Sequence, residues 1–366
     1  MTRSPPRPVL LLLPLLGGCD LLDDVFSEFD GDLETRTFSA DSVEGMATLD
    51  VELDGQEAFQ LTATSGQLVA VEAIYDDDGD RVLYWEDWYG SQSLTGAIWL
   101  EGKDTVLNWP VRAEDRELSS GTWTVEVGVV DSEGYYTDAT VNATLKLKQD
   151  ADLLDGRVKA RIVYAEGLSQ DAVVSAGVEA AVTRWEEVWA PYGLELEPTY
   201  ESSSYSSDQD FPGESSEHDD LAEGSSGSEV TVLVAETIDG GMDYYGIAGS
   251  IPGTLGQTSR ALVVVSWLAN AGGDGAFNDD DVRLFGETLA HEVGHYMGLF
   301  HPVEMTFDYW DALDDTDDCA NQSGCESTLG DNLMFPYPVC DWTSCIAQDQ
   351  LTGGQTGVSH RYTGTL

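Results

Sequence analysis

Three of the five histidines in this chain lie within one stretch of eleven residues, His291 to His301. An α-helix completes a turn in about 3.6 residues, so His291 and His295 project from one helix face and can offer ring nitrogens to one metal ion. Glu292, beside them, is placed to act as a general base without being a ligand. Gly298 can take a left-handed conformation and end the helix, which lets His301 supply a third nitrogen. Three neutral imidazoles predict a catalytic zinc site, because they leave the fourth tetrahedral position open.

The elements expected around this stretch belong to a mixed sheet with helices. Apolar patterns predict a helix at 171–189 and strands at 157–164, 194–200, 230–236 and 261–266. Asn278 suits the N-cap of the helix that carries the histidines. Residues 246–253 are glycine-rich and end near a proline, which suits an edge strand beside the cleft, with a simple loop as the alternative. Residues 201–229 are rich in Ser, Gly and acidic residues, so we expect a mobile surface insertion in which His218 is exposed and is not a ligand.

The preceding part of the chain, residues 35–149, has another pattern. Short stretches of alternating apolar and polar residues, such as Trp123 to Val129, are separated by turn residues. About seven strands of this length favour a β-sandwich, and Ser120 to Val125 is similar to a strand of bacterial immunoglobulin-like domains. We therefore expect an immunoglobulin-like sandwich at 35–149, followed by an α+β domain at 150–366 that carries the zinc site.

The first residues predict export. Basic residues precede an apolar run that is too short to span a bilayer, and Leu16-Gly17-Gly18-Cys19 resembles a bacterial lipobox. This resemblance implies a signal peptide at 1–18, a lipid-modified Cys19 and an acidic tether at 19–34. An ordinary signal peptide cut nearby is the alternative. The expected location is the outer membrane or cell surface, outside the cytoplasm.

Charge and cysteine content narrow the choice of partners. The chain has 16 basic and 68 acidic residues, a net charge of −52, which argues against charge-driven binding to nucleic acid or to anionic lipid. Without Cys19, an even set of four cysteines remains, consistent with two disulfides in an exported protein. These are Cys319, Cys325, Cys340 and Cys345. We expect a protein or peptide substrate, no nucleic acid, membrane contact through the lipid alone, and a monomer.

His291 to His301 matches the pattern HExxHxxGxxH and resembles the metzincin zinc endopeptidases. The resemblance implies a methionine turn beneath the zinc site. Asp331 to Pro336 looks like that turn, with Met334 as an apolar floor under the histidines. Asp315-Thr316 and Leu351 to Gln355 are similar to the lower subdomain of the pappalysins, which makes these the most similar subfamily.

The resemblance covers roughly residues 157–355, and the chain departs from it in two places. Asp317 stands where pappalysins tend to have proline, and Pro336 stands where they tend to have a tyrosine. Tyr337 comes one place later, so we do not count it as catalytic.

Two further features follow from the resemblance. Related enzymes use the segment after His301 for structural calcium, and oxygen ligands at this density suit a hard cation. The candidate ligands are Asp314, Asp315 and Asp317. An acidic segment without an ion is the alternative. By analogy the disulfides would interlace, which is one of three pairings that four cysteines allow. The implied pairs are Cys319 with Cys340 and Cys325 with Cys345.

The residues and the resemblance together predict an extracytoplasmic zinc-dependent endopeptidase, with Glu292 as general base toward a water at the zinc. Two other classes stay open. A non-proteolytic zinc hydrolase could use the same ligands on a small substrate, and cleavage of a peptide library would separate the two. A surface-binding lipoprotein with an inactive metzincin domain would hold zinc but cleave no protein.

Overall fold

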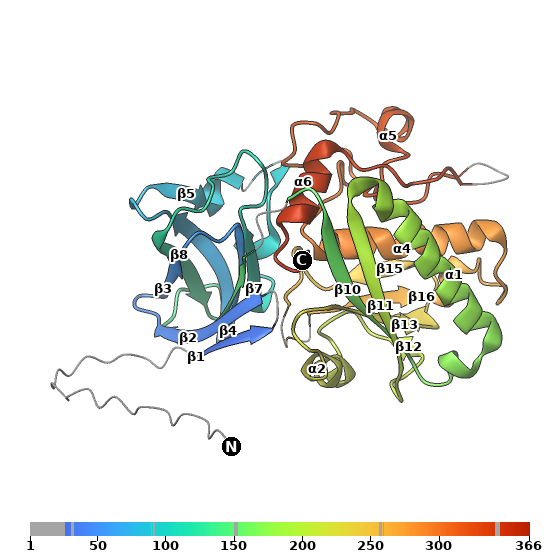
Figure 1. The fold of residues 1–366 in the computed structure, drawn as a ribbon, viewed down its shortest axis with the longest axis horizontal. Coiled ribbons are helices and arrows are strands. Elements are labelled where there is room, and N and C mark those ends of the chain that lie inside the picture. The colour runs from blue at the N-terminus through green and yellow to red at the C-terminus, as the bar shows by residue number, and fades with distance from the viewer. Residues whose placement is uncertain are drawn as a thin grey trace, which may run out of the picture.

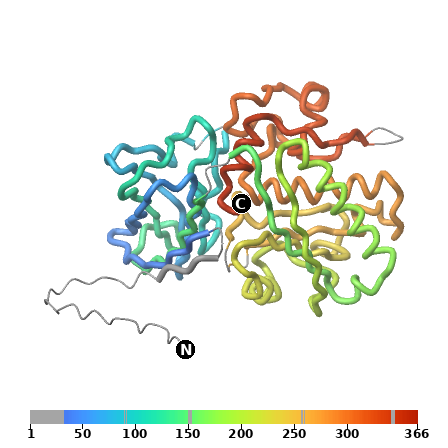
Figure 2. The backbone as a smooth tube through the Cα atoms, in the orientation of Figure 1, coloured from blue at the N-terminus to red at the C-terminus, as the bar shows by residue number. Residues whose placement is uncertain are grey.

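The computed structural model describes residues 26–30, 33–88, 90, 92–149, 153–255, 258, 260–340 and 345–366, with backbone alone for 26–30. The predicted signal peptide at 1–18 and the predicted lipidation site Cys19 lie outside these ranges. We call residues 26–149 the N-terminal half and residues 153–366 the C-terminal half. Figures 1 and 2 show the two halves side by side, with the N-terminal half in blue to green and the C-terminal half in green to red.

The N-terminal half is built from strands around one long central strand. These are β1 (Phe26–Asp30), β2 (Leu33–Asp41), β3 (Met46–Leu53), β4 (Ala58–Tyr75), β5 (Arg81–Tyr84), β6 (Gln92–Ser93), β7 (Gly102–Trp109), β8 (Gly121–Val130) and β9 (Thr140–Lys148). Short 3₁₀ turns lie at Trp85–Trp88 and Gly96–Ile98. The sheet order is β1-β2-β9-β4-β8-β3, and β5 and β7 also pair with β4.

Apart from β6, the strands of this half form one continuous hydrogen-bonded sheet, because the 18 residues of β4 pair with β9 along their first part and with β8 along their second. One long strand can be shared by two packed layers, so the expected immunoglobulin-like sandwich stays a prediction. One expectation for this half needs correction. The tether expected at 19–34 overlaps structure, since β1 pairs with β2 from Phe26 onward.

The C-terminal half contains the mixed sheet that the sequence predicted. Its strands are β10 (Gly156–Tyr164), β11 (Leu194–Ser202), β13 (Val230–Ala235), β15 (Gly246–Ala248) and β16 (Val263–Ser266). The order is β11-β10-β13-β16-β15, and the neighbours are parallel except for β15, which runs antiparallel to β16. Residues 246–248 are thus an edge strand rather than a simple loop. Two small sheets pair β12 (Asp208–Gln209) with β14 (Thr237–Ile238), and β17 (Trp310–Asp311) with β6 of the other half.

The helices of this half begin at capping residues. They are α1 (Ala172–Trp189), α2 (Ser216–Glu223), α3 (Trp267–Asn270), α4 (Asp279–Tyr296), α5 (Gln322–Leu329) and α6 (Gly353–Arg361), with 3₁₀ turns at Leu168–Gln170 and Ala190–Tyr192. The Asn278 side chain accepts from the N–H groups of Asp280 and Asp281 and completes a capping box at the start of α4. Helices α1 and α4 pack closely, since a Cβ at Gly286 would lie 2.5 Å from Cβ of Arg184. Within the described ranges, no helix has the length and apolar character needed to cross a membrane.

The segment at 201–229 is ordered rather than a mobile insertion. It contains the end of β11, β12 and helix α2, whose first turn is capped by Ser215. His218 lies on the inner face of α2, fully buried, with Nε2 3.0 Å from Oε1 of Gln209. It is therefore a core histidine and not the exposed residue that the segment's composition indicated.

The disulfides are local rather than interlaced. Cys319 pairs with Cys325, and Cys340 with Cys345, with Cα–Cα distances of 5.1 and 3.8 Å. Asn321 caps α5 and turns the chain so that Cys325, in the first turn, faces Cys319. Cys340 and Cys345 face each other across an isolated antiparallel bridge. Two disulfides fit a protein of an extracytoplasmic compartment.

Candidate metal centre

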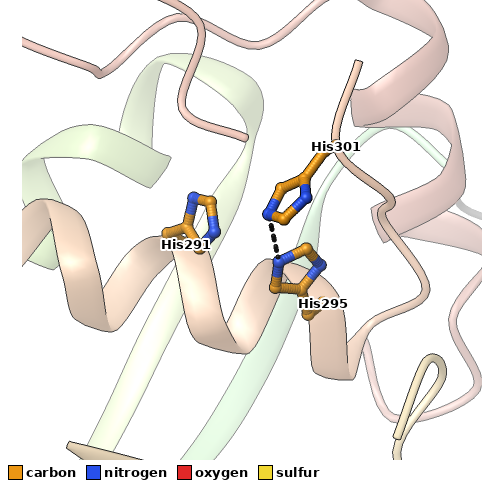
Figure 3. Close-up of side chains that lie close together, drawn as sticks. All are labelled: His291, His295 and His301. Atoms are coloured by element: carbon orange, nitrogen blue, oxygen red, sulfur yellow. Dashed lines mark hydrogen bonds between the residues drawn. The ribbon is translucent and has the colours of Figure 1, made fainter. Parts of the chain in front are cut away.

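Three histidine rings converge at the end of α4. His291 and His295 project from one helix face and His301 approaches from the following segment (Figure 3). Gly298, with φ +107°, makes the turn that brings His301 back. The potential ligand atoms of the three residues lie within 4.8 Å of one another, and among the residues described here no other group of three His, Cys, Asp or Glu does so. The sequence therefore identified this cluster correctly.

The hydrogen bonds of these rings fix which nitrogens face inward. Nδ1 of His291 lies 2.7 Å from the carbonyl oxygen of Leu333, and Nδ1 of His295 lies 2.7 Å from that of Leu299. A carbonyl oxygen can only accept, so both Nδ1 atoms carry the hydrogen. In a neutral imidazole this leaves Nε2 as an unprotonated lone pair. Each of these two rings thus presents a lone pair to the centre of the cluster.

The third ring is held in the same way by a carboxylate. Oε2 of Glu304 accepts from Nδ1 of His301 at 2.9 Å. Nε2 of His301 lies 3.1 Å from Nε2 of His295. Two lone pairs at this distance repel unless a cation lies between them. Two imidazole nitrogens on one tetrahedral zinc would be about 3.3 Å apart, so the donor set fits such an ion.

A proton on one of the buried rings does not take the place of a metal ion between the nitrogens of His295 and His301. Burial lowers the pKa of His291 to about 3, with a further contribution from His301. Burial also lowers the pKa of His295 well below its ordinary value. Both rings are therefore neutral at neutral pH and able to bind a metal.

Glu292 lies between the histidines and the edge strand. Only 8% of it is exposed, and burial raises the pKa of its carboxyl to about 8, against the opposing effect of a hydrogen bond from the backbone N–H of Ala248. It is one residue from His291 and lines the same cavity. A carboxyl with a pKa in this range can both accept a proton and return it near neutral pH.

The segment expected to form the methionine turn packs against α4. Met334 is fully buried, and a Cβ at Gly294 would lie 2.7 Å from its Sδ, so the thioether contacts α4 at the residue before His295. Asn332 accepts from the Met334 N–H at 2.9 Å and exchanges two hydrogen bonds with Gln355. The turn is thereby tied to α6, which joins two segments that the sequence had linked only through the resemblance.

A cavity of 290 Å³ opens beside His291 and Glu292. Its walls are mainly apolar and include Leu284 from α4, and Phe335 and Pro336 from the segment expected to form the methionine turn. Gly246 of β15 forms part of the mouth. The cavity is therefore placed to receive a group attached next to the bond that the site would act on.

Other residues singled out from the sequence lie outside the three-histidine cluster. Asp315 accepts from the Thr352 hydroxyl at 3.0 Å and from the Gly354 N–H at 2.7 Å, so it holds the first turn of α6, whose N-cap is Thr352. Together with Asp314 and Asp317 it forms no three-ligand cluster within the described residues. Tyr337 lines the same cavity as His291 and Glu292, and its hydroxyl donates to Glu326 at 3.1 Å, so its omission from the catalytic residues stays a prediction.

Sequence reasoning missed Glu304 and Gly246. Glu304 stands three residues after His301, and a carboxylate that close to a ligand could have been recognised as its orienting partner. Gly246 was placed correctly on the edge strand, but its contact with Glu292 depends on how α4 crosses β15, which no local pattern reveals.

No protein-family model matches this chain, and no curated protein matches it either. Among solved structures, it is similar to metalloproteinase-II from Bacteroides fragilis, with 10% sequence identity and a TM-score of 0.27, over 77% of this chain and 74% of that chain. The assignment therefore depends on the residues of this chain. They define an α+β protein with a three-histidine cluster fit to hold a metal ion.

Proposed function

We propose that this protein is a zinc-dependent endopeptidase of the metzincin kind, similar to the pappalysins. His291, His295 and His301 would hold the zinc, and Glu292 would be the general base. One observation carries the proposal: three inward-facing imidazole nitrogens lie next to a buried carboxylate at an open sheet edge. Zinc is the ion that three neutral histidines and an open fourth position suit best.

Zinc bound there supplies a Lewis acid that polarises a substrate carbonyl and acidifies water. The chain's own residues supply the rest. Glu292 takes the proton of the attacking water and delivers it to the nitrogen of the departing amine. Its burial favours holding that proton between the two steps, because burial disfavours the ionised carboxylate. The carbonyl oxygens of Leu333 and Leu299 and the carboxylate of Glu304 keep the three rings in the orientation that the ligands need.

The substrate we propose is an extended peptide segment. Strand β15 pairs with β16 on one side only and is the last strand of the sheet order. An edge strand offers backbone N–H and C=O groups with which an extended peptide can pair. Since Glu292 lies under this strand, a peptide paired there would place a backbone carbonyl beside the histidines.

We also propose that the protein is exported and anchored through a lipid on Cys19, with a β-sandwich domain at 35–149 before the peptidase domain at 150–366. Support for the anchor is the lipobox-like Leu16 to Cys19, and the two disulfides fit the compartment. Mass spectrometry of the mature N-terminus tests the anchor: a lipid mass on Cys19 supports it, and an unmodified different first residue contradicts it.

The activity is tested with the purified exported chain and a peptide library, assayed with and without a zinc chelator. We expect cleavage of internal peptide bonds that stops on chelation and returns with added zinc. Zinc content with no cleavage of any peptide or protein would favour the inactive binding protein. Turnover of small esters or amides without peptide cleavage would favour the non-proteolytic hydrolase.

A further inference from the structure

The segment that follows the edge strand in the sequence, residues 249–255, is hydrogen-bonded to α4, the helix that carries the histidines. The Gly253 N–H donates to the carbonyl oxygen of Tyr296, the last residue of α4, at 2.8 Å. The Tyr296 hydroxyl donates to the carbonyl oxygen of Thr254. Tyr296 directly follows His295, so a shift of this segment would displace both the end of α4 and β15.

On its other side, the same segment is held by β4 of the N-terminal half. Gln60 is 1% exposed, and its amide makes two hydrogen bonds with the segment: Nε2 donates to the Gly253 carbonyl oxygen at 3.1 Å, and Oε1 accepts from the Leu255 N–H at 2.7 Å. Two residues along β4, the Thr62 hydroxyl lies 2.5 Å from that of Thr254. A side chain of the N-terminal half thus satisfies backbone groups of the C-terminal half.

The N-terminal half makes two more contacts close to the site. The Gly96 N–H donates to the carbonyl oxygen of Ile251 at 2.7 Å, which holds the start of the segment. The ring of Trp99 packs edge-on against Phe300, with centroids 5.6 Å apart, and Phe300 directly precedes His301. The N-terminal half therefore contacts both the segment that follows the edge strand and the residue before the third histidine.

The segment has no room to relax toward α4. A Cβ at Gly253 would lie 2.2 Å from the Tyr296 ring, so the backbone already rests on that ring. If the Gln60 amide is removed, the Leu255 N–H loses its buried partner, whereas the Gly253 carbonyl keeps the hydrogen bond from the Tyr362 hydroxyl at 3.0 Å. An unpaired buried N–H is costly unless the backbone moves to find another partner. We therefore expect any adjustment to displace the segment away from α4 and to be transmitted to β15.

We propose that the N-terminal half is a working part of the catalytic unit rather than an appended binding module, and that Gln60 is a positioning residue for strand β15. The proposal rests on the proposed function, because β15 is taken as the substrate edge. It assigns the N-terminal half a role in how substrate is held, while the histidines and Glu292 keep theirs.

The test compares Gln60→Met with wild type in the full, zinc-loaded chain. Methionine keeps the volume and loses both hydrogen bonds. We expect amide exchange in residues 246–255 to rise roughly tenfold while α1 exchanges as before, since one buried backbone hydrogen bond is worth about a factor of ten. We also expect KM for an extended peptide to rise several-fold with little change in kcat, at unchanged zinc content. Gln67→Met, on the same strand and partly exposed, is the matched control.

A second pair of variants, at Thr62, tests the same contact in case Gln60→Met has a folding defect. Thr62→Val removes the hydroxyl with little change in shape, and Thr62→Ser keeps it, so the valine variant should show the same local change in exchange and the serine variant should recover. Exchange at 246–255 that matches wild type in both Gln60→Met and Thr62→Val would overturn the positioning role. A wild-type chain that cleaves nothing would instead overturn the proposed function, and the exchange result would still decide whether Gln60 holds the strand.

Discussion

Gly246 lies directly over Glu292: a Cβ at position 246 would be 2.6 Å from Cγ of that glutamate. Two residues later, the Ala248 N–H donates to the same carboxylate. The proposed substrate edge and the proposed base are thus in direct contact, with no space for a side chain between them. This contact explains why a glycine stands at the start of β15, although its φ is not left-handed.

Alanine at position 246 should therefore disturb the reaction without removing the metal. The added methyl group must displace either the Glu292 carboxylate or the edge strand, so we expect kcat/KM to fall at least tenfold with zinc content unchanged. Gly241→Ala is the control, because the nearest atoms to a Cβ there are 3.9 Å away. Equal activity in the two variants would show that the contact between Gly246 and Glu292 has no role in catalysis.

The carboxylate of Glu304 should matter for metal affinity. It accepts from Nδ1 of His301 and fixes the ring that comes from outside the helix. Replacing Glu304 by alanine should weaken zinc binding about 10- to 100-fold, the usual effect of losing such an orienting partner. A competition titration against a chelator of known affinity measures this. Asp308→Asn, which changes an exposed carboxylate nearby, should leave the affinity as it is, and a Glu304 variant that binds as tightly as wild type would refute the role.

The cavity beside Glu292 predicts a preference for a large apolar side chain next to the cleaved bond. Its base includes Glu287, whose carboxylate oxygens accept from Arg184 at 2.9 Å and Arg283 at 2.7 Å. The negative charge there is already balanced, so an arginine or lysine of the substrate would gain no partner at that depth. Peptides with Phe or Leu at one flanking position should be cleaved roughly tenfold faster than peptides with Ala or Arg there, measured as kcat/KM.

Leu284 of α4 lines this cavity, so substitutions at position 284 test the preference directly. Tryptophan at position 284 should fill the space and lower the ratio of kcat/KM for Phe over Ala, while alanine should raise it. The informative result is which of the two variants has the higher ratio of kcat/KM for Phe over Ala. Faster cleavage beside Arg in the wild-type enzyme would show that Asp243, exposed at the rim, selects the substrate instead.

The buried carboxyl group of Asp311 predicts that the stability of the protein depends on pH. It is 3% exposed, its Oδ2 has no hydrogen-bond partner among the described residues, and burial raises the pKa of its carboxyl to about 7. The folded state therefore binds more protons than the unfolded state between about pH 4 and pH 7, so this group makes the free energy of unfolding fall as pH rises through that window. Asp311→Asn should become the more stable form by about 1–3 kcal/mol above pH 7.

Denaturant unfolding of both proteins at pH 5 and pH 8 checks this, with Asp308→Asn as the exposed control. A difference between wild type and Asp311→Asn that does not change with pH would contradict it. Calcium bears on the same region: if millimolar calcium stabilised the wild type at pH 8 but not Asp311→Asn, the structural calcium site expected from the sequence would gain its first support.

Much of the fold around the site could be predicted from the sequence because its signals are local. The capping residues Asp171 and Asn278 place the starts of α1 and α4, and the apolar run before Trp267 marks a strand buried on both faces. The histidine spacing and the glycine at position 298 are likewise local, so the cluster itself was predictable.

Two of the features that the sequence did not reveal depend on tertiary contacts, and a third depends on a local cap. His218 lies in a stretch of polar composition, yet tertiary packing buries it against Gln209. The disulfide pairing was inferred by analogy, whereas the cap at Asn321 decides it locally. The contact of Gln60 with Gly253 spans 193 residues, and no periodicity or motif could indicate it.

The substitution Glu292→Gln tests the central claim most directly. Glutamine keeps the size and hydrogen-bonding shape of the side chain but cannot take a proton from water. The account predicts that the variant binds one zinc per chain, as tightly as wild type, while cleavage of the best library peptide falls at least 100-fold. A zinc-loaded variant that cleaves this peptide at the wild-type rate would contradict the assignment of the base and the mechanism built on it.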